Sequence, residues 1–115
     1  MRLPKNQNPS GWVTVVFKRH ATELFQLSNE ELAGFWREVA DVSKAIHAKF
    51  SPVKIHYMIF GSICPHLHCH LVAKQKEDDP YAPIILGSKP ENILDTTTRE
   101  SICTDLKNIL SSVQK

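Results

Sequence analysis

Strict alternation of apolar and polar residues marks one short stretch of the chain, residues 65–74. His66, His68 and His70 alternate there with apolar side chains. A period of two is typical of a β-strand, on which residues i, i+2 and i+4 face the same way. The pattern predicts a strand from about residue 63 to 73, with a row of three imidazoles on one face and apolar residues facing a core on the other.

Two further stretches have the composition of strands. Residues 12–17 are rich in valine and aromatic residues and are apolar on both faces, which predicts a central, covered strand. Residues 53–60 predict another strand, separated from the histidine strand by a turn at Gly61 and Ser62. A connection this short indicates an antiparallel hairpin.

A long amphipathic helix is predicted to follow Ser28. Ser28 and Glu31 have the spacing of a capping box, in which each side chain bonds the backbone N–H of the other residue. Apolar residues then recur with helical spacing at Leu32, Phe35, Trp36, Val39, Val42, Ile46 and Phe50. Pro52 prevents further extension and should push Ser51 toward extended backbone.

A second helix is predicted from about Thr98 to Val113, after a loop over residues 76–90. Thr97 and Glu100 offer another capping box. The apolar stripe of this helix consists of Ile102, Leu106, Ile109, Leu110 and Val113. Together these elements predict an α+β fold, in which an antiparallel sheet has a long helix packed across it and a helix at the C-terminal end.

Composition adds bounds to this picture. The 115 residues predict a single domain, 1–115, in which residues 1–10 form a polar N-terminal arm. A net charge of +2 is too small to indicate binding to nucleic acid or to a membrane. No apolar run approaches the roughly 20 residues of a transmembrane helix. Three cysteines without C-x-x-C spacing favour a reducing, cytoplasmic setting.

The histidine row carries the candidate chemistry. Neutral imidazole is a good nucleophile, and neighbouring imidazoles disfavour one another's charged forms. A histidine whose Nδ1–H is held by a carbonyl presents Nε2 as a nucleophile, while its neighbours can stabilise a transferring phosphoryl group. Cys64 is expected on the same face, bordering the pocket. Trp12 and Trp36 are interpreted as core residues rather than as platforms for a base.

The alternation resembles the signature of the histidine triad (HIT) family of nucleotidyl hydrolases and transferases. Gly61 and Pro65 precede the triad as in that family, and an acidic Asp78–Pro80 loop follows it. Residues 11–20 are similar to the family's Gly-apolar strand ending in Lys-Arg-His. The resemblance extends over about residues 11–87 and is strongest to the bacterial branch that resembles diadenosine polyphosphate hydrolases. It implies a HIT-like fold.

The resemblance also implies roles for individual residues. His68, the middle histidine, would attack the α-phosphorus of a nucleoside phosphate, and water would then release the monophosphate from a covalent nucleotidyl-histidine. His66 and His70 would orient His68 and contact the phosphate. His20 matches an upstream histidine that bonds to the triad. Ser62 stands where relatives usually have an Asn or Gln that contacts the phosphate.

The implied substrate is a nucleotide, of the dinucleoside polyphosphate or adenosine phosphoramidate type, and no metal or cofactor is required. A homodimer is implied as well. Relatives have a hairpin ahead of the segment that begins here at Gly11, and it is apparently missing from this chain. Departures at Ala73-Lys74 and Leu86-Gly87, where relatives often have Pro-Arg and Trp-Gly, keep open a nucleotide-binding protein with little or no turnover.

A metal-binding, histidine-rich strand is the other open alternative. His-x-His can chelate zinc, and Cys64 adds a further ligand type on the same face. Residues four apart on a strand are separated by roughly 13 Å, so the outer histidines would barely reach one ion. The favoured interpretation is therefore a nucleotide hydrolase.

Overall fold

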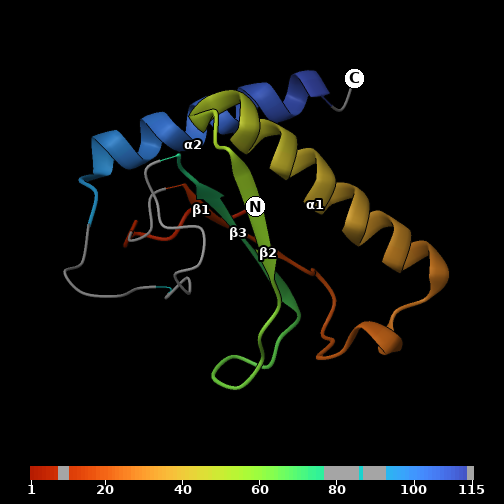
Figure 1. Cartoon of the computed structure of the whole chain (residues 1–115). Helices are drawn as coiled ribbons and strands as arrows, with labels where there is room; N and C mark the ends of the chain where they lie inside the picture. The colour runs from red at the N-terminus through yellow and green to blue at the C-terminus, as the bar shows by residue number, and fades with distance from the viewer. Residues whose placement is uncertain (8–10, 77–85, 87–92, 114–115) are drawn as a thin grey trace.

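The computed structural model describes residues 1–7, 11–76, 86 and 93–113. Its elements are β1 (Trp12–Val16), a 3₁₀ turn (Leu24–Gln26), α1 (Asn29–Phe50), β2 (Lys54–Met58), β3 (His68–Lys74) and α2 (Thr96–Val113). The strands form one antiparallel sheet in the order β1-β3-β2. Helix α1 packs across one face of this sheet and α2 packs against α1 (Figure 1). The predicted α+β fold is confirmed.

The central strand is β3, so the predicted central position of residues 12–17 is wrong. β1 pairs with β3 on one side, and on the other side Arg2 forms an isolated bridge to Thr14. The prediction that this strand is covered is correct, because Val13, Thr14 and Val15 are all buried. A strand that is apolar on both faces needs packing on both faces, which does not require a strand along both edges.

The predicted antiparallel hairpin of β2 and β3 is confirmed, with Lys54 opposite Lys74 and Met58 opposite His70. β3 begins later than predicted, at His68. The preceding residue is bonded elsewhere: the Leu67 N–H donates to the Ala21 carbonyl at 2.8 Å. His66 therefore precedes the strand.

Helix α1 begins and ends where the sequence predicts. Ser28 Oγ accepts from the Glu31 N–H at 3.1 Å, and Glu31 Oε1 accepts from the Ser28 N–H at 2.9 Å. Ser51 is not extended, as Pro52 led us to expect, but left-handed, at φ 48° and ψ 51°. In this conformation its N–H reaches the His47 carbonyl at 3.0 Å, which satisfies an acceptor that the helix end would otherwise leave open.

Helix α2 begins at Thr96, earlier than predicted, and Asp95 caps it in place of Thr97. The Asp95 carboxylate accepts from the Thr98 N–H at 2.7 Å. That hydrogen bond lowers the pKa of Asp95. Aspartate and threonine are both favoured N-cap residues, so the sequence offered two candidate caps close together, Asp95 and Thr97. Within the described residues, no helix is both long and apolar enough to cross a bilayer.

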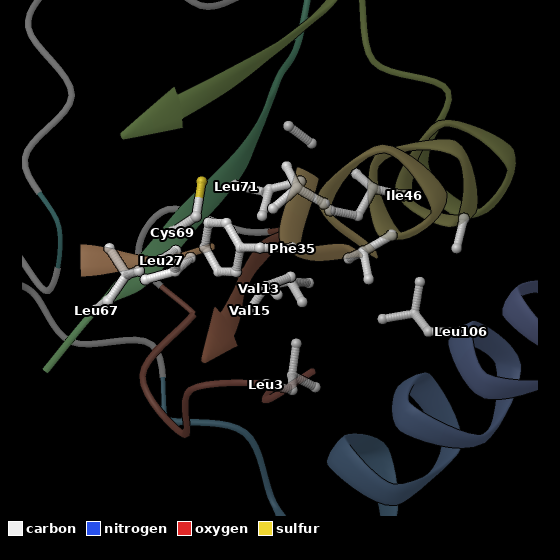
Figure 2. Packing of buried hydrophobic residues seen from close by; sticks show 14 of the residues in the cluster. Leu3, Val13, Val15, Leu27, Phe35, Ile46, Leu67, Cys69, Leu71 and Leu106 are labelled. Carbon is white, nitrogen blue, oxygen red and sulfur yellow. The ribbon is translucent and has the colours of Figure 1, made fainter. Parts of the chain in front are cut away.

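The core lies between the sheet and the helices (Figure 2). Both helices and the strands β1 and β3 contribute fully or almost fully buried side chains: Val13, Val15, Phe35, Ile46, Cys69, Leu71 and Leu106. Leu3 from the N-terminal arm is also 3 % exposed and joins this cluster. Burying a side chain of this size contributes roughly 1.5–3 kcal/mol, so residues 1–7 are an integral part of the domain.

The buried side chain of Gln7 fixes the N-terminal arm to the start of β1. Its Nε2 donates to the carbonyls of Pro4 at 3.0 Å and Trp12 at 2.9 Å. Its Oε1 accepts from the Gly11 N–H at 3.0 Å and the Trp12 N–H at 3.3 Å. The side chain thus pairs with backbone groups much as a neighbouring strand would.

Candidate active site

The sheet face that points away from the core carries the candidate site. Register places Thr14 opposite His70 and Val16 opposite His68 across the β1-β3 pair. Side chains alternate along each strand, so Trp12 shares this face. The next residues along β3, such as Cys69, point into the core. The structure therefore places two of the three predicted imidazoles side by side on one strand.

His66 reaches the site in another way. Because it precedes β3, its imidazole does not continue the row; its Nε2 bonds the Phe17 carbonyl instead. Its own carbonyl oxygen lies 2.6 Å from His68 Nδ1. The main chain of His66, rather than its ring, contacts the middle histidine.

A chain of hydrogen bonds determines where the protons lie. Trp12 Nε1 lies 3.1 Å from His70 Nδ1, and His70 Nε2 lies 3.0 Å from His68 Nε2. An indole N–H can only donate and a carbonyl can only accept. His70 Nδ1 must therefore accept from Trp12, and His68 Nδ1 must donate to His66. The His70 proton is then on Nε2, and His68 Nε2 holds a lone pair.

The surroundings keep His70 neutral. Burial lowers the pKa of His70, and the nearby His68 lowers it further. The indole of Trp12 acts in the same direction, because a second proton on His70 Nδ1 would face the indole N–H. The two imidazole rings meet edge to face, with centroids 4.6 Å apart. His68 Nε2 carries no proton, and its lone pair accepts from His70 Nε2–H; a ligand that displaces this hydrogen bond meets a nitrogen able to act as a nucleophile.

A cavity of about 580 Å³ opens beside this pair. We call it the apolar cavity; it is lined by Trp12, Phe60, Gly61, Ser62, Ile63, Cys64, His68, His70 and Leu86. The predicted substrate-binding residues Ser62 and Cys64 both belong to it. Phe60 is 57 % exposed and its ring lies 6.0 Å from that of His70, so an aromatic face is available to a ligand.

A second cavity, of about 460 Å³, adjoins the first. We call it the basic cavity; it is lined by Arg2, Leu3, Pro4, Lys5, Thr14, Val16, Cys64, His66, His68 and Arg99. His68 and Cys64 line both cavities. The middle histidine is therefore accessible from two chemically different spaces.

His20 is exposed and lies beside the site. Its ring centroid is 6.0 Å from that of His66. The expected hydrogen bond from His20 to the triad is not formed among the described residues, because His66 Nε2 is already bonded to the Phe17 carbonyl. His20 contacts the triad through ring packing alone.

Sequence reasoning missed several residues of the site. Trp12 was interpreted as core, yet it is partly exposed and bonds His70. Trp36, also interpreted as core, is 41 % exposed on α1. The period of two relates Trp12 to Thr14, but only the register of strand pairing shows that this face is also the face of the histidines. Asp78–Pro80 lie outside the described residues.

The described residues do not gather metal ligands. Across residues 1–7, 11–76, 86 and 93–113, no three His, Cys, Asp or Glu side chains come together as a ligand set. The facing nitrogens of His68 and His70 are bonded to each other. The geometry is that of a hydrogen-bonded pair beside two cavities.

Fold and site together define a protein in which histidines on a central strand face a ligand cavity. The chain belongs to the HIT family: the HIT domain matches residues 4–77. Proteins of this family are generally nucleotide hydrolases or transferases. No curated protein sequence matches the chain.

Solved structures agree with this assignment. A histidine triad protein from Bradyrhizobium japonicum superimposes with a TM-score of 0.79 at 22% identity, over 92% of this chain and 79% of that one. A histidine triad protein from Marinobacter aquaeolei VT8 gives 0.77 at 21%, over 89% and 75%. A hypothetical histidine triad nucleotide-binding protein from Sulfolobus tokodaii strain7 gives 0.76 at 20%, over 97% and 77%. At these identities the similarity shows the fold.

Proposed function

We propose that this protein hydrolyses a nucleoside phosphate at its α-phosphate through a covalent nucleotidyl-histidine on His68. One observation carries the proposal: His68 lines both cavities, its Nδ1 donates to the His66 carbonyl, and its Nε2 carries no proton and accepts from His70. A neutral imidazole held in this way is an activated nucleophile.

The reaction has two steps. In the first, His68 Nε2 forms a bond to the α-phosphorus while the bond from phosphorus to the leaving oxygen or nitrogen breaks; a leaving phosphate departs as its anion, and a leaving amine takes its proton from water. His70 Nε2–H, released from His68, donates a hydrogen bond to a phosphate oxygen. The His66 carbonyl stabilises the positive charge that develops on the His68 ring, because it accepts from Nδ1. In the second step, water attacks the phosphorus and loses a proton to solvent, the bond from phosphorus to Nε2 breaks with its electron pair returning to His68, and the nucleoside monophosphate is released.

The apolar cavity suits the nucleoside. Trp12 and Phe60 offer rings against which a base can stack, and such stacking is worth about 1–3 kcal/mol per base. Ser62 supplies a hydroxyl that can donate to a phosphate oxygen, and Cys64 borders the same space. A dinucleoside polyphosphate or an adenosine phosphoramidate is the proposed substrate, as in the branch that resembles diadenosine polyphosphate hydrolases.

The covalent intermediate can be observed directly. The protein is mixed with adenosine phosphoramidate or diadenosine tetraphosphate, quenched within milliseconds and measured by intact-protein mass spectrometry. We expect an adduct with the mass of AMP in the wild type and in His47→Ala, whose histidine is exposed on α1. We expect none in His68→Ala.

Three outcomes would contradict the proposal. Near-normal turnover by His68→Ala would exclude this nucleophile. Wild-type protein that binds AMP in calorimetry, but forms no adduct and releases no AMP, would be a nucleotide-binding protein without turnover. Loss of a bound metal together with a fall in melting temperature on chelation would instead favour the metal-binding strand.

We also propose that the protein is a homodimer, as the family resemblance implies. The outer edge of β2 supports this, because Lys54 and Tyr57 are exposed there. Sedimentation equilibrium tests it. A protein that sediments as a monomer at tens of micromolar would contradict it.

A further inference from the structure

The basic cavity carries more positive charge than attack by His68 requires. Of the described residues that line it, Arg2, Lys5 and Arg99 are cations and none is an acid. None of the three takes part in a salt bridge within the described part of the chain. Positive charge without acidic partners beside a reacting phosphate favours an anionic ligand.

Backbone contacts hold two of these cations at the cavity. The main chain of Arg2 exchanges hydrogen bonds of 2.7 and 2.8 Å with Thr14 on the outer edge of β1. The Lys5 carbonyl accepts from the Leu94 N–H at 3.2 Å. Both side chains are exposed. The positions of these residues are therefore fixed by the main chain, and the charged groups are free to contact a ligand.

Arg99 is the third cation that lines the basic cavity. Its Nε and Nη2 donate to the Leu3 carbonyl at 3.2 and 2.8 Å, so the guanidinium joins α2 to the N-terminal arm. The positive charge stays half-buried at the cavity wall. The N-terminal arm and α2 thus bring three cations to one cavity.

The two cavities meet at His68 and Cys64. A molecule whose α-phosphorus lies at His68 Nε2 can therefore place a base in the apolar cavity and a charged chain in the basic cavity. A neutral leaving group such as ammonia would make no use of the cations. Several linked phosphates would interact with all three.

We propose that the basic cavity binds the polyphosphate portion that leaves when His68 attacks, which makes a dinucleoside polyphosphate the preferred substrate over a phosphoramidate. This inference rests on the proposed function and adds the class of leaving group. Arg2 and Lys5 contact the leaving phosphates directly, while Arg99 both contacts them and anchors the arm.

The test compares two substrates in one double variant. Arg2→Gln/Lys5→Gln removes both charges and keeps side chains that cover similar area. We measure kcat/KM for diadenosine tetraphosphate and divide it by kcat/KM for adenosine phosphoramidate. We expect this ratio to fall about tenfold, because the loss of hydrogen bonds from charged groups on a surface screened by salt weakens binding by about that factor. Lys44→Gln, exposed on α1 and lining neither cavity, should keep the wild-type ratio.

An unchanged ratio in the double variant would overturn the inference, whether or not both activities fall together. Wild-type protein that hydrolyses the phosphoramidate but not the tetraphosphate would also overturn it. If the wild type hydrolyses neither substrate, the proposed function fails, but the cavity assignment can still be tested. Calorimetry then measures the binding of inorganic tripolyphosphate. Weaker binding by the double variant than by Lys44→Gln supports the cavity assignment, and equal binding refutes it.

Discussion

Replacing Trp12 with phenylalanine tests the proton arrangement of the site. The centroids of the Trp12 and His70 rings lie 5.8 Å apart, and phenylalanine keeps a ring at this place. It removes the indole N–H, whose nitrogen lies 3.1 Å from His70 Nδ1. Without that donor, the His70 proton can move to Nδ1. Its Nε2 lone pair would then face the lone pair of His68 Nε2, and the hydrogen bond that orients the nucleophile would be lost.

The size of the effect follows from the strength of that hydrogen bond. A neutral hydrogen bond in a partly buried place contributes about 0.5–1.5 kcal/mol net. At 1.4 kcal/mol per factor of ten, the productive tautomer falls roughly 2- to 12-fold relative to its competitor. We expect kcat to fall by about that factor at a pH where both histidines are neutral.

The pH profile provides the second measurement. In the wild type, burial and the nearby His68 lower the pKa of His70. The Trp12 N–H donates to Nδ1, the nitrogen that a second proton would occupy. The variant lacks the indole N–H, so His70 accepts a proton at higher pH. The acid limb of kcat/KM should therefore move to higher pH. Nitrogen-15 NMR of the histidine rings should show the His70 proton on Nε2 in the wild type. In the variant it should show a mixture of two tautomers, with the proton on Nε2 in one and on Nδ1 in the other.

Trp36→Phe is the matched control, because Trp36 is 41 % exposed on α1 and packs against Phe35. It should keep the wild-type kcat and acid limb. A Trp12→Phe protein with the same kcat, acid limb and ring spectra as the wild type would refute the tautomer assignment. A change in KM alone would show that Trp12 only lines the apolar cavity.

Two further predictions concern stability and reactivity. Arg19, and after it the Ser28 N–H, lower the pKa of Glu31 from 4.5 to about 2, so the stability this carboxylate contributes is present above pH 4.5 and lost as the pH falls to about 2. Urea unfolding should show that the free energy of unfolding lost in Arg19→Gln becomes smaller as the pH falls over that range. A loss that stays constant with pH would contradict this prediction. Burial raises the pKa of the Cys69 thiol and leaves it inaccessible, whereas Cys64 is exposed. Iodoacetamide should label Cys64 first and Cys69 only on unfolding, and AMP should slow the labelling of Cys64; early labelling of Cys69 in peptide maps would show that the core opens.

Local signals in the sequence predicted local structure well. The Ser28 box and the helical spacing after it are short-range patterns, and α1 has the bounds they indicate. The alternation around His68 and His70 likewise predicted the strand and its two faces. Both rest on interactions within a few residues of one another, which a sequence displays directly.

Features that depend on distant contacts could not be predicted in this way. The bond of Trp12 to His70 depends on the register of β1 against β3. Leu3 is a single apolar residue in a polar segment, so no periodicity marks it, yet it is buried. The late start of β3 depends on where the backbone of Leu67 finds partners. The basic cavity gathers residues from both ends of the chain, and no spacing rule connects them.

The position of the N-terminal arm also limits how the sheet can grow. Arg2 and Gln7 occupy the outer edge of β1, while no other described segment pairs with the outer edge of β2. Open strand edges can add a strand from another chain. A sheet with two open edges could extend through copy after copy into a fibre, but a sheet with one open edge is complete once two copies have paired about a two-fold axis. By occupying the outer edge of β1, the arm leaves the outer edge of β2 as the edge, among the described residues, to which another strand could be added.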